Sequence, residues 1–267
     1  MLVVSDPYDK SRWDIQSAVV KGDRYQICHD CVGFGKIEGS DLHYAVVCDG
    51  CGNGEYVANA SLISVIRSCF LVATMEDAEM TTEEDFSVIA AWICDEVSMT
   101  LKDKIDQTES EWHHWATTWM LVIWNSSKVF VSSVGDSIAL IKNNGQWQQL
   151  ISLGREFGAS LTEHIPIDTE TRMRTSYWEG SFEEIILSTD GMEPVIWKNG
   201  DKKMSQEVCN SMSFLRNKEQ NHESVTNIIG EHRVCDGNRA YIEFLYSSSV
   251  RWFSNDDKAV IVIKHNP

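Results

Sequence analysis

Aspartates stand at the ends of three apolar stretches of the chain. Asp49 and Asp190 each follow such a stretch and precede a glycine, whereas Asp256 comes just before the last one. A fourth aspartate, Asp30, lies in a segment that could pair with the one ending at Asp49. Carboxylates gathered at one end of a sheet stay ionised only when cations accompany them. Oxygen ligands without converging histidines favour Mg²⁺ or Mn²⁺ over zinc. Two such ions about 3.5–4 Å apart form the centre used for hydrolytic attack at phosphorus.

The bulk composition restricts the partners of such a site. The chain has 267 residues and a net charge of −17, which argues against nucleic acid and against an anionic membrane surface. The amino terminus shows no secretory pattern, and the most apolar stretch, residues 115–124, is too short to span a bilayer. We therefore expect a cytoplasmic protein with reduced cysteines. We also expect residues 1–267 to form a single domain.

The periodicity of apolar residues indicates the elements that position the aspartates. Helices are predicted over 56–72, 86–101, 202–215 and 224–232. Strands are predicted over 13–20, 24–34, 43–49, 119–124, 128–134, 138–141, 146–151, 182–187 and 259–263. The Asn144–Gly145 pair is a strong hairpin signal. Residues 152–180 have little periodicity, and we interpret them as a flap or long loop.

The order of these motifs along the chain resembles that of the metal-dependent type 2C (PPM-type) Ser/Thr protein phosphatases. The likeness is closer to a bacterial branch with an Asp-Gly-x-Gly motif, here at Asp49 to Gly52, and it extends over about residues 17–263. The matching positions, in chain order, are Asp30, Asp49-Gly50, Thr117-Thr118, Gly135-Asp136-Ser137, Asp190-Gly191 and Asp256-Asp257.

The resemblance implies an α+β fold, a four-layer α-β-β-α sandwich of two mainly antiparallel sheets flanked by helices. It also implies hydrolysis of phosphoserine and phosphothreonine in proteins by a water that two Mn²⁺ or Mg²⁺ ions activate. The implied partner is a phosphoprotein made by a Ser/Thr kinase. The threonine pair would be structural. The implied metal site has Asp49 as the bridging ligand, the Gly50 carbonyl on the second ion, Asp190 and Asp256 on the first, Asp30 holding metal-bound waters, and Asp136 at a weaker third ion.

Three positions depart from the family pattern. Cys51 replaces a histidine that eukaryotic members use as the proposed general acid. Tyr25 stands where those members have a phosphate-binding arginine, so we assign phosphate binding to the adjacent Arg24 or to an arginine of residues 152–180. His29 precedes Asp30 where glutamate or glutamine is usual. These changes leave the carboxylates in place and affect protonation of the leaving group and phosphate affinity.

Two other functions fit parts of the sequence. Cys28-x2-Cys31 and Cys48-x2-Cys51 are sixteen residues apart, a spacing compatible with a structural four-cysteine zinc element. Alternatively, the chain could be a regulatory or binding module with a phosphatase fold and little or no catalysis. We interpret the pair His113-His114 as a loop or strand entry rather than a metal site.

Overall fold

The computed structural model describes residues 3–5, 12–75, 82–151, 163–166, 172–197, 204–215, 224–229 and 232–266. These residues build two sheets. The first has six strands, in spatial order β1 (Val3–Ser5), β3 (Asp30–Lys36), β4 (His43–Asp49), β5 (Trp119–Trp124), β6 (Lys128–Val134) and β9 (Arg174–Glu179). Its pairings are antiparallel except that of β1 with β3.

The second sheet has seven antiparallel strands. In spatial order they are β11 (Ser224–Ile229), β12 (His232–Asn238), β2 (Trp13–Val20), β13 (Lys258–His265), β10 (Glu184–Ser188), β7 (Ile138–Asn143) and β8 (Gln146–Gln149). The β7–β8 hairpin turns at Asn144 and Gly145, both with positive φ, as the sequence predicted.

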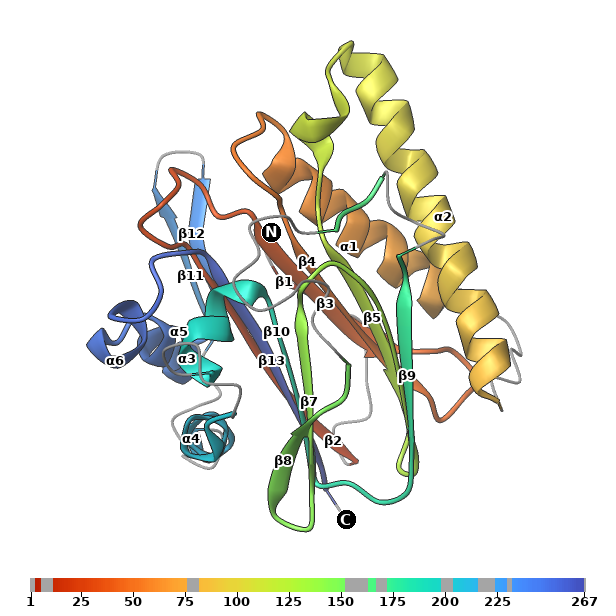
Figure 1. The fold of residues 1–267 in the computed structure, drawn as a ribbon, viewed down its shortest axis with the longest axis vertical. Helices are drawn as coiled ribbons and strands as arrows, with labels where there is room; N and C mark the ends of the chain where they lie inside the picture. Colours follow the sequence, from red (N-terminus) through yellow and green to blue (C-terminus); the bar gives the residue numbers. More distant parts are fainter. Residues whose placement is uncertain are drawn as a thin grey trace.

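Helices cover both outer faces of the sheets, and Figure 1 shows the two groups on opposite sides. On the six-stranded sheet lie α1 (Val57–Ala73) and α2 (Glu83–Thr108), and the second begins with a capping box in which Thr82 and Asp85 bond each other's backbone. On the seven-stranded sheet lie α3 (Glu193–Ile196), α4 (Gln206–Leu215), α5 (Arg239–Leu245) and α6 (Ser248–Arg251). Two short 3-10 turns, η1 (Trp112–Trp115) and η2 (Asp190–Met192), complete the described elements.

The alternation of side chains along β4 explains the layering. Tyr44, Val46 and Cys48 point into the core beneath α1 and α2, whereas Ala45 and Val47 point into the core between the sheets. Strand β13 does the same on the other side, where its alternate residues face the core beneath α3 to α6. Three apolar cores therefore separate four layers, which confirms the predicted α-β-β-α sandwich.

Three predictions of local structure were wrong. The strand predicted over 24–34 begins only at Asp30, since residues 24–29 form a loop. Residues 224–232 were predicted as a helix, but 224–229 form β11 and 232 begins β12, because β12 pairs with β2 and extends the sheet outward. The predicted flap over 152–180 includes 174–179, which form the edge strand β9 along β6. Of that segment, 152–162 and 167–171 lie outside the described residues. The prediction of one domain over residues 1–267 stays a prediction.

In the part of the chain that the structure describes, no helix is long and apolar enough to cross a membrane.

Candidate metal centre

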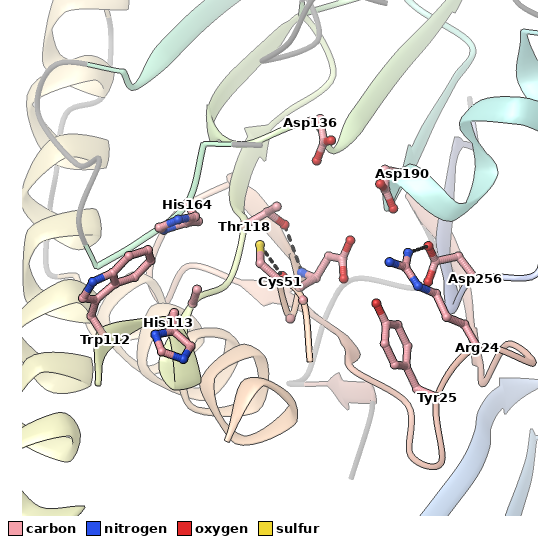
Figure 2. Close-up of a pocket in the computed structure, with 14 residues that line it drawn as sticks. Arg24, Tyr25, Cys51, Trp112, His113, Thr118, Asp136, His164, Asp190 and Asp256 are labelled. Atoms are coloured by element: carbon pink, nitrogen blue, oxygen red, sulfur yellow. Dashed lines mark hydrogen bonds and ion pairs between the residues drawn. The ribbon is translucent and has the colours of Figure 1, made fainter. Parts of the chain in front are cut away.

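The ends of β4, β10 and the segment before β13 meet at one pocket of about 350 Å³. Figure 2 shows Asp136, Asp190 and Asp256 around one part of it and Trp112, His113 and His164 around another. The residues that line the pocket are Arg24, Tyr25, Asp49, Gly50, Cys51, Gly52, Trp112, His113, Ala116, Thr118, Asp136, His164, Asp190 and Asp256. All the sequence-predicted site residues except Asp30 are among them.

Asp30 lies directly beside the pocket. It starts β3 and is the register partner of Asp49, which ends β4. Its side chain is 1% exposed, and Oδ2 accepts a hydrogen bond of 2.7 Å from Thr189 Oγ1. Its other oxygen, Oδ1, is buried and has no hydrogen-bond partner. A buried carboxylate oxygen without a donor is costly, so this atom calls for a cation or a bound water.

The backbone of Asp49 is held by Thr117 and Thr118, which come just before β5. Its carbonyl accepts hydrogen bonds from Thr118 N at 2.8 Å and from Thr117 Oγ1 at 2.8 Å. Its own N–H donates to Thr118 Oγ1 at 3.0 Å. These bonds fix the direction of the Asp49 side chain, and they show that the threonine pair positions the strand end.

The glycine after Asp49 is required by close packing. A Cβ on Gly50 would lie 2.6 Å from the carbonyl oxygen of Val57 in α1. The Gly50 N–H donates to the carbonyl of His29 at 3.2 Å. The turn therefore carries its backbone into the pocket lining, where a carbonyl oxygen can serve as a ligand.

Asp256 and Asp257 have different surroundings although they are adjacent. Asp257 is 3% exposed, and its two oxygens accept hydrogen bonds of 2.7 Å from the backbone N–H groups of Gly22 and His29. Asp256 lines the pocket instead, and its Oδ2 pairs with Arg24 Nη1 at 3.0 Å. Asp256 is therefore the member of the pair that faces the pocket, and Asp257 holds the loop that carries it. The assignment of Asp256 as the last metal ligand stays a prediction.

The aspartates raise one another's pKa. Burial, followed by the Asp257 carboxylate, raises the pKa of Asp30 well above its usual value. Asp49 keeps part of its surface open to the pocket. Loss of solvation through burial, followed by the charges of Asp30 and Asp190, nevertheless raises its pKa as well. Both carboxyl groups therefore resist ionisation unless a positive charge joins them.

Arg24 is the single lysine or arginine among the described residues that line this pocket. Another predicted phosphate-binding candidate, Arg174, is committed elsewhere: it donates to the Gly135 carbonyl and lies 3.7 Å from Glu163. Four aspartates and one arginine give the lining a negative balance, so a phosphate could enter only together with additional cations.

The oxygen donors of this pocket suit Mg²⁺ or Mn²⁺ better than zinc. The four aspartates and the Gly50 carbonyl supply hard ligands, and the partnerless oxygen of Asp30 lies next to them. Within the described ranges, however, no three His, Cys, Asp or Glu side chains already converge on one point. The chemistry of these oxygen donors therefore fits divalent ions. The donors lie in one pocket, but their side chains do not yet converge on a common point.

The four cysteines of the zinc hypothesis do not converge. Cys28 lies in the core between the sheets, whereas Cys31 and Cys48 lie in the core beneath α1 and α2. Cys51 lines the pocket, and its Sγ donates to the Asp49 carbonyl at 3.6 Å. Burial, followed by Asp136, raises the pKa of the Cys51 thiol, so it stays protonated. These positions exclude a four-cysteine zinc site.

Several pocket residues were not assigned a functional role by the sequence analysis. His113 belongs to a turn that enters β5, as expected, but its ring and that of Trp112 also line the pocket. His164 was missed because it lies in the segment interpreted as a flap. Tyr25 was noted only as a replacement; its ring stacks on His29 at 4.2 Å between centroids. The sequence feature that could have pointed to these residues is the run of tryptophans and histidines from Trp112 to Trp115.

Comparison with known proteins gives one family and one fold. The sequence model of the protein phosphatase 2C family matches residues 22–229. No curated protein sequence matches the chain.

Several solved structures share the fold. The serine/threonine phosphatase Stp1 from Staphylococcus aureus is 16% identical, with a TM-score of 0.66, and the match covers 95% of each chain. The S. agalactiae serine/threonine phosphatase is 12% identical, with a TM-score of 0.65, over 95% of this chain and 100% of that one. RsbX, solved in complex with magnesium, is 13% identical, with a TM-score of 0.55, over 98% of this chain and 99% of that one.

Proposed function

Because the chain belongs to the protein phosphatase 2C family, we propose that it is a metal-dependent phosphatase acting on phosphoserine and phosphothreonine in proteins. One observation carries this proposal: aspartates from distant parts of the chain and the Gly50 backbone line a single pocket. An acidic pocket of this kind suits a phosphate ester only when divalent cations accompany it.

We assign two Mn²⁺ or Mg²⁺ ions to this pocket, as in other two-metal hydrolytic centres, with a weaker third beside them. When bound, these ions would lower the pKa of water at the site and offset the charge of the phosphate. The residues that would hold the ions are Asp49, Gly50 through its carbonyl, Asp190, Asp256 and, for the third ion, Asp136.

The chain's own residues position the reactants. The threonine pair fixes Asp49, and Asp257 fixes the loop that carries Asp256. Asp30 Oδ1 is free to accept a hydrogen bond from a water of the centre. Arg24 can exchange its contact with Asp256 for the phosphate oxygens, since its side chain is 54% exposed.

The reaction is a hydrolysis. The oxygen of water bonds to phosphorus while the bond from phosphorus to the serine or threonine Oγ breaks. A proton returns to that Oγ, which yields inorganic phosphate and the free hydroxyl group. Because the Cys51 Sγ–H is directed to the Asp49 carbonyl at 3.6 Å, we propose that this proton comes from a water molecule in the pocket rather than from Cys51.

The substrate that fits this proposal is a cytoplasmic phosphoprotein made by a Ser/Thr kinase. The charge of −17 argues against nucleic acid and against an anionic membrane as partners.

The test is phosphate release from a phosphothreonine peptide by wild type and Asp49→Asn, with Mn²⁺, Mg²⁺ or EDTA. Release that needs a divalent ion and is lost in the variant would support the proposal. A folded wild type that releases no phosphate with any ion would overturn it. That result would favour the second candidate, a binding module with a phosphatase fold. Two features also suit this candidate: Cys51 stands where eukaryotic members have a histidine, and no three metal-binding side chains converge within the described residues.

A further inference from the structure

One side of the pocket is built from rings rather than carboxylates. Trp112, His113 and His164, which we call the aromatic shelf, all line the pocket. The rings of Trp112 and His164 are stacked, with centroids 5.1 Å apart and planes at 24°. Trp112 is 46% exposed. In Figure 2 the shelf lies across the pocket from Arg24, Tyr25 and Asp256.

The turn that carries Trp112 and His113 is anchored on the side facing α1. His114 accepts two hydrogen bonds there, from Glu55 N to its Nδ1 at 3.0 Å and from Tyr56 N to its carbonyl at 3.1 Å. A Cβ on Gly54 would lie 2.6 Å from His114 Cα, so only glycine permits this approach. The turn is therefore pressed closely against the chain that leads into α1.

The turn is also anchored at its end. Trp115 is buried, its Nε1 donates to Ser110 Oγ at 2.9 Å, and its ring stacks on Tyr56 at 4.9 Å between centroids. An indole that remains half-exposed on a turn fixed in this way presents a flat apolar face at little entropic cost. Exposed tryptophans on rigid supports beside a site are typical contact residues for a ligand.

His164 is held by a separate pairing. Ile165 is fully buried and exchanges two backbone hydrogen bonds with Thr117, of 2.9 and 3.1 Å. The Thr117 hydroxyl also donates to the carbonyl of Asp49 at 2.8 Å, so Thr117 connects the shelf to the acidic side. A substrate whose phosphate lies among the aspartates therefore has a preformed ring surface within the same pocket.

We propose that the aromatic shelf binds an aromatic side chain adjacent to the phosphorylated residue of the substrate. This inference rests on the proposed function, since it concerns the specificity of that same site. An aromatic neighbour can stack on Trp112. An acidic neighbour would face the aspartates of the pocket, and His113 is already paired with Glu111 at 3.2 Å.

The experiment uses two matched sets of phosphothreonine peptides with Mn²⁺. In one set the residue before the phosphothreonine is Phe, Leu, Lys or Ala, and in the other set the residue after it varies in the same way. For wild type we expect, in one of the two sets, a kcat/KM for Phe roughly 3- to 10-fold above that for Ala, the range that aromatic pairs support. Trp112→Ala should bring this ratio to about 1, whereas Trp112→Phe should keep most of it.

Trp252→Ala is the matched control, because Trp252 is 86% exposed and does not line the pocket. It should leave the Phe-to-Ala ratio unchanged. The inference is overturned if wild type hydrolyses the Phe and Ala peptides equally in both sets, if it prefers Lys, or if Trp112→Ala keeps the preference for Phe. In those cases the proposed function still stands. A wild type that hydrolyses none of the peptides overturns both.

Discussion

The acidic side of the pocket and the aromatic shelf are built in different ways. The acidic side draws on chain segments separated by more than 200 residues, from Asp49 to Asp256, which meet because strands of both sheets end there. The shelf comes from one 3-10 turn and one short bridge to Thr117. The first draws on the ends of strands in both sheets, whereas the second rests on a few contacts with the chain before α1 and with Thr117.

This difference suggests that the two sides have separate roles, the acidic side in hydrolysis and the shelf in the choice of substrate. Metal chemistry demands ligands from several directions, so its residues are tied to the fold and to its strand ends. The ring surface that we assign to a neighbouring side chain needs only one anchored turn and the short segment of His164 beside it. We therefore expect changes on the acidic side to affect turnover of every substrate, and changes on the shelf to affect the choice among substrates.

The largest expected effect is the loss of the central carboxylate. Asp49→Asn should lower kcat/KM for every phosphopeptide at least about 1,000-fold, because several kcal/mol of charge stabilisation disappear with the ligand. Initial rates of phosphate release in Mn²⁺ measure this loss. Asp41→Asn removes an exposed carboxylate far from the pocket and serves as the control. A loss of less than tenfold in kcat/KM would contradict the role of Asp49 as a central metal ligand.

Within the acidic side, Asp256 and Asp257 allow a pocket-lining carboxylate to be compared with a structural one. Asp257→Ala leaves two buried backbone N–H groups, of Gly22 and His29, without acceptors. It should lower the free energy of unfolding by about 2–4 kcal/mol. Asp256→Asn should abolish most activity but change stability by less than about 1 kcal/mol, since its pair with Arg24 is partly exposed.

Urea denaturation of both variants and of wild type measures these differences. If Asp256→Asn unfolded the protein as readily as Asp257→Ala, both residues would be structural.

A smaller effect is expected at Arg24, which lines the pocket. Arg24→Ala should raise KM for a phosphopeptide about tenfold while kcat changes little, because a charge-assisted contact to the phosphate is lost. Steady-state kinetics separate the two constants. Arg251→Ala is a matched control, since this exposed arginine forms a similar pair, with Asp23 at 2.7 Å. A fall in kcat without a change in KM would contradict the assigned role.

The smallest effect is expected between the two sides, at Cys51. Its thiol is protonated and donates to a backbone carbonyl that two other groups already satisfy. Cys51→Ser should therefore change kcat/KM by less than about threefold, because a hydroxyl can make the same hydrogen bond. A loss of 100-fold or more in the same assay would show that the thiol acts in the reaction.

Much of the fold could be predicted from the sequence because the strands are short, apolar and bounded by turns. The predicted ranges 13–20, 43–49, 119–124 and 128–134 match strands β2, β4, β5 and β6. The helix predicted over 224–232 failed because pairing of β12 with β2, which is remote in sequence, decides that region. The edge strand β9 was missed because its polar residues obscure the alternation of a half-buried strand.

The site was predictable to the extent that its residue types and order carry the chemistry. The order of the aspartates could be read directly, and the structure gathers them at one pocket. The different surroundings of Asp256 and Asp257 could not be derived, because they depend on amides of Gly22 and His29 at the other end of the chain. The shelf was also hidden, since a Trp-His turn has no fixed spacing that indicates a pocket.

The most direct test of the account is a calorimetric titration of Mn²⁺ into wild type and Asp49→Asn, after removal of metal with EDTA. We expect about two ions to bind each wild-type chain, as in two-metal hydrolytic centres, and most of this binding to be lost in the variant. A folded wild type that binds no Mn²⁺, or an Asp49→Asn variant that binds it equally well, would contradict the assignment of the pocket as a metal centre.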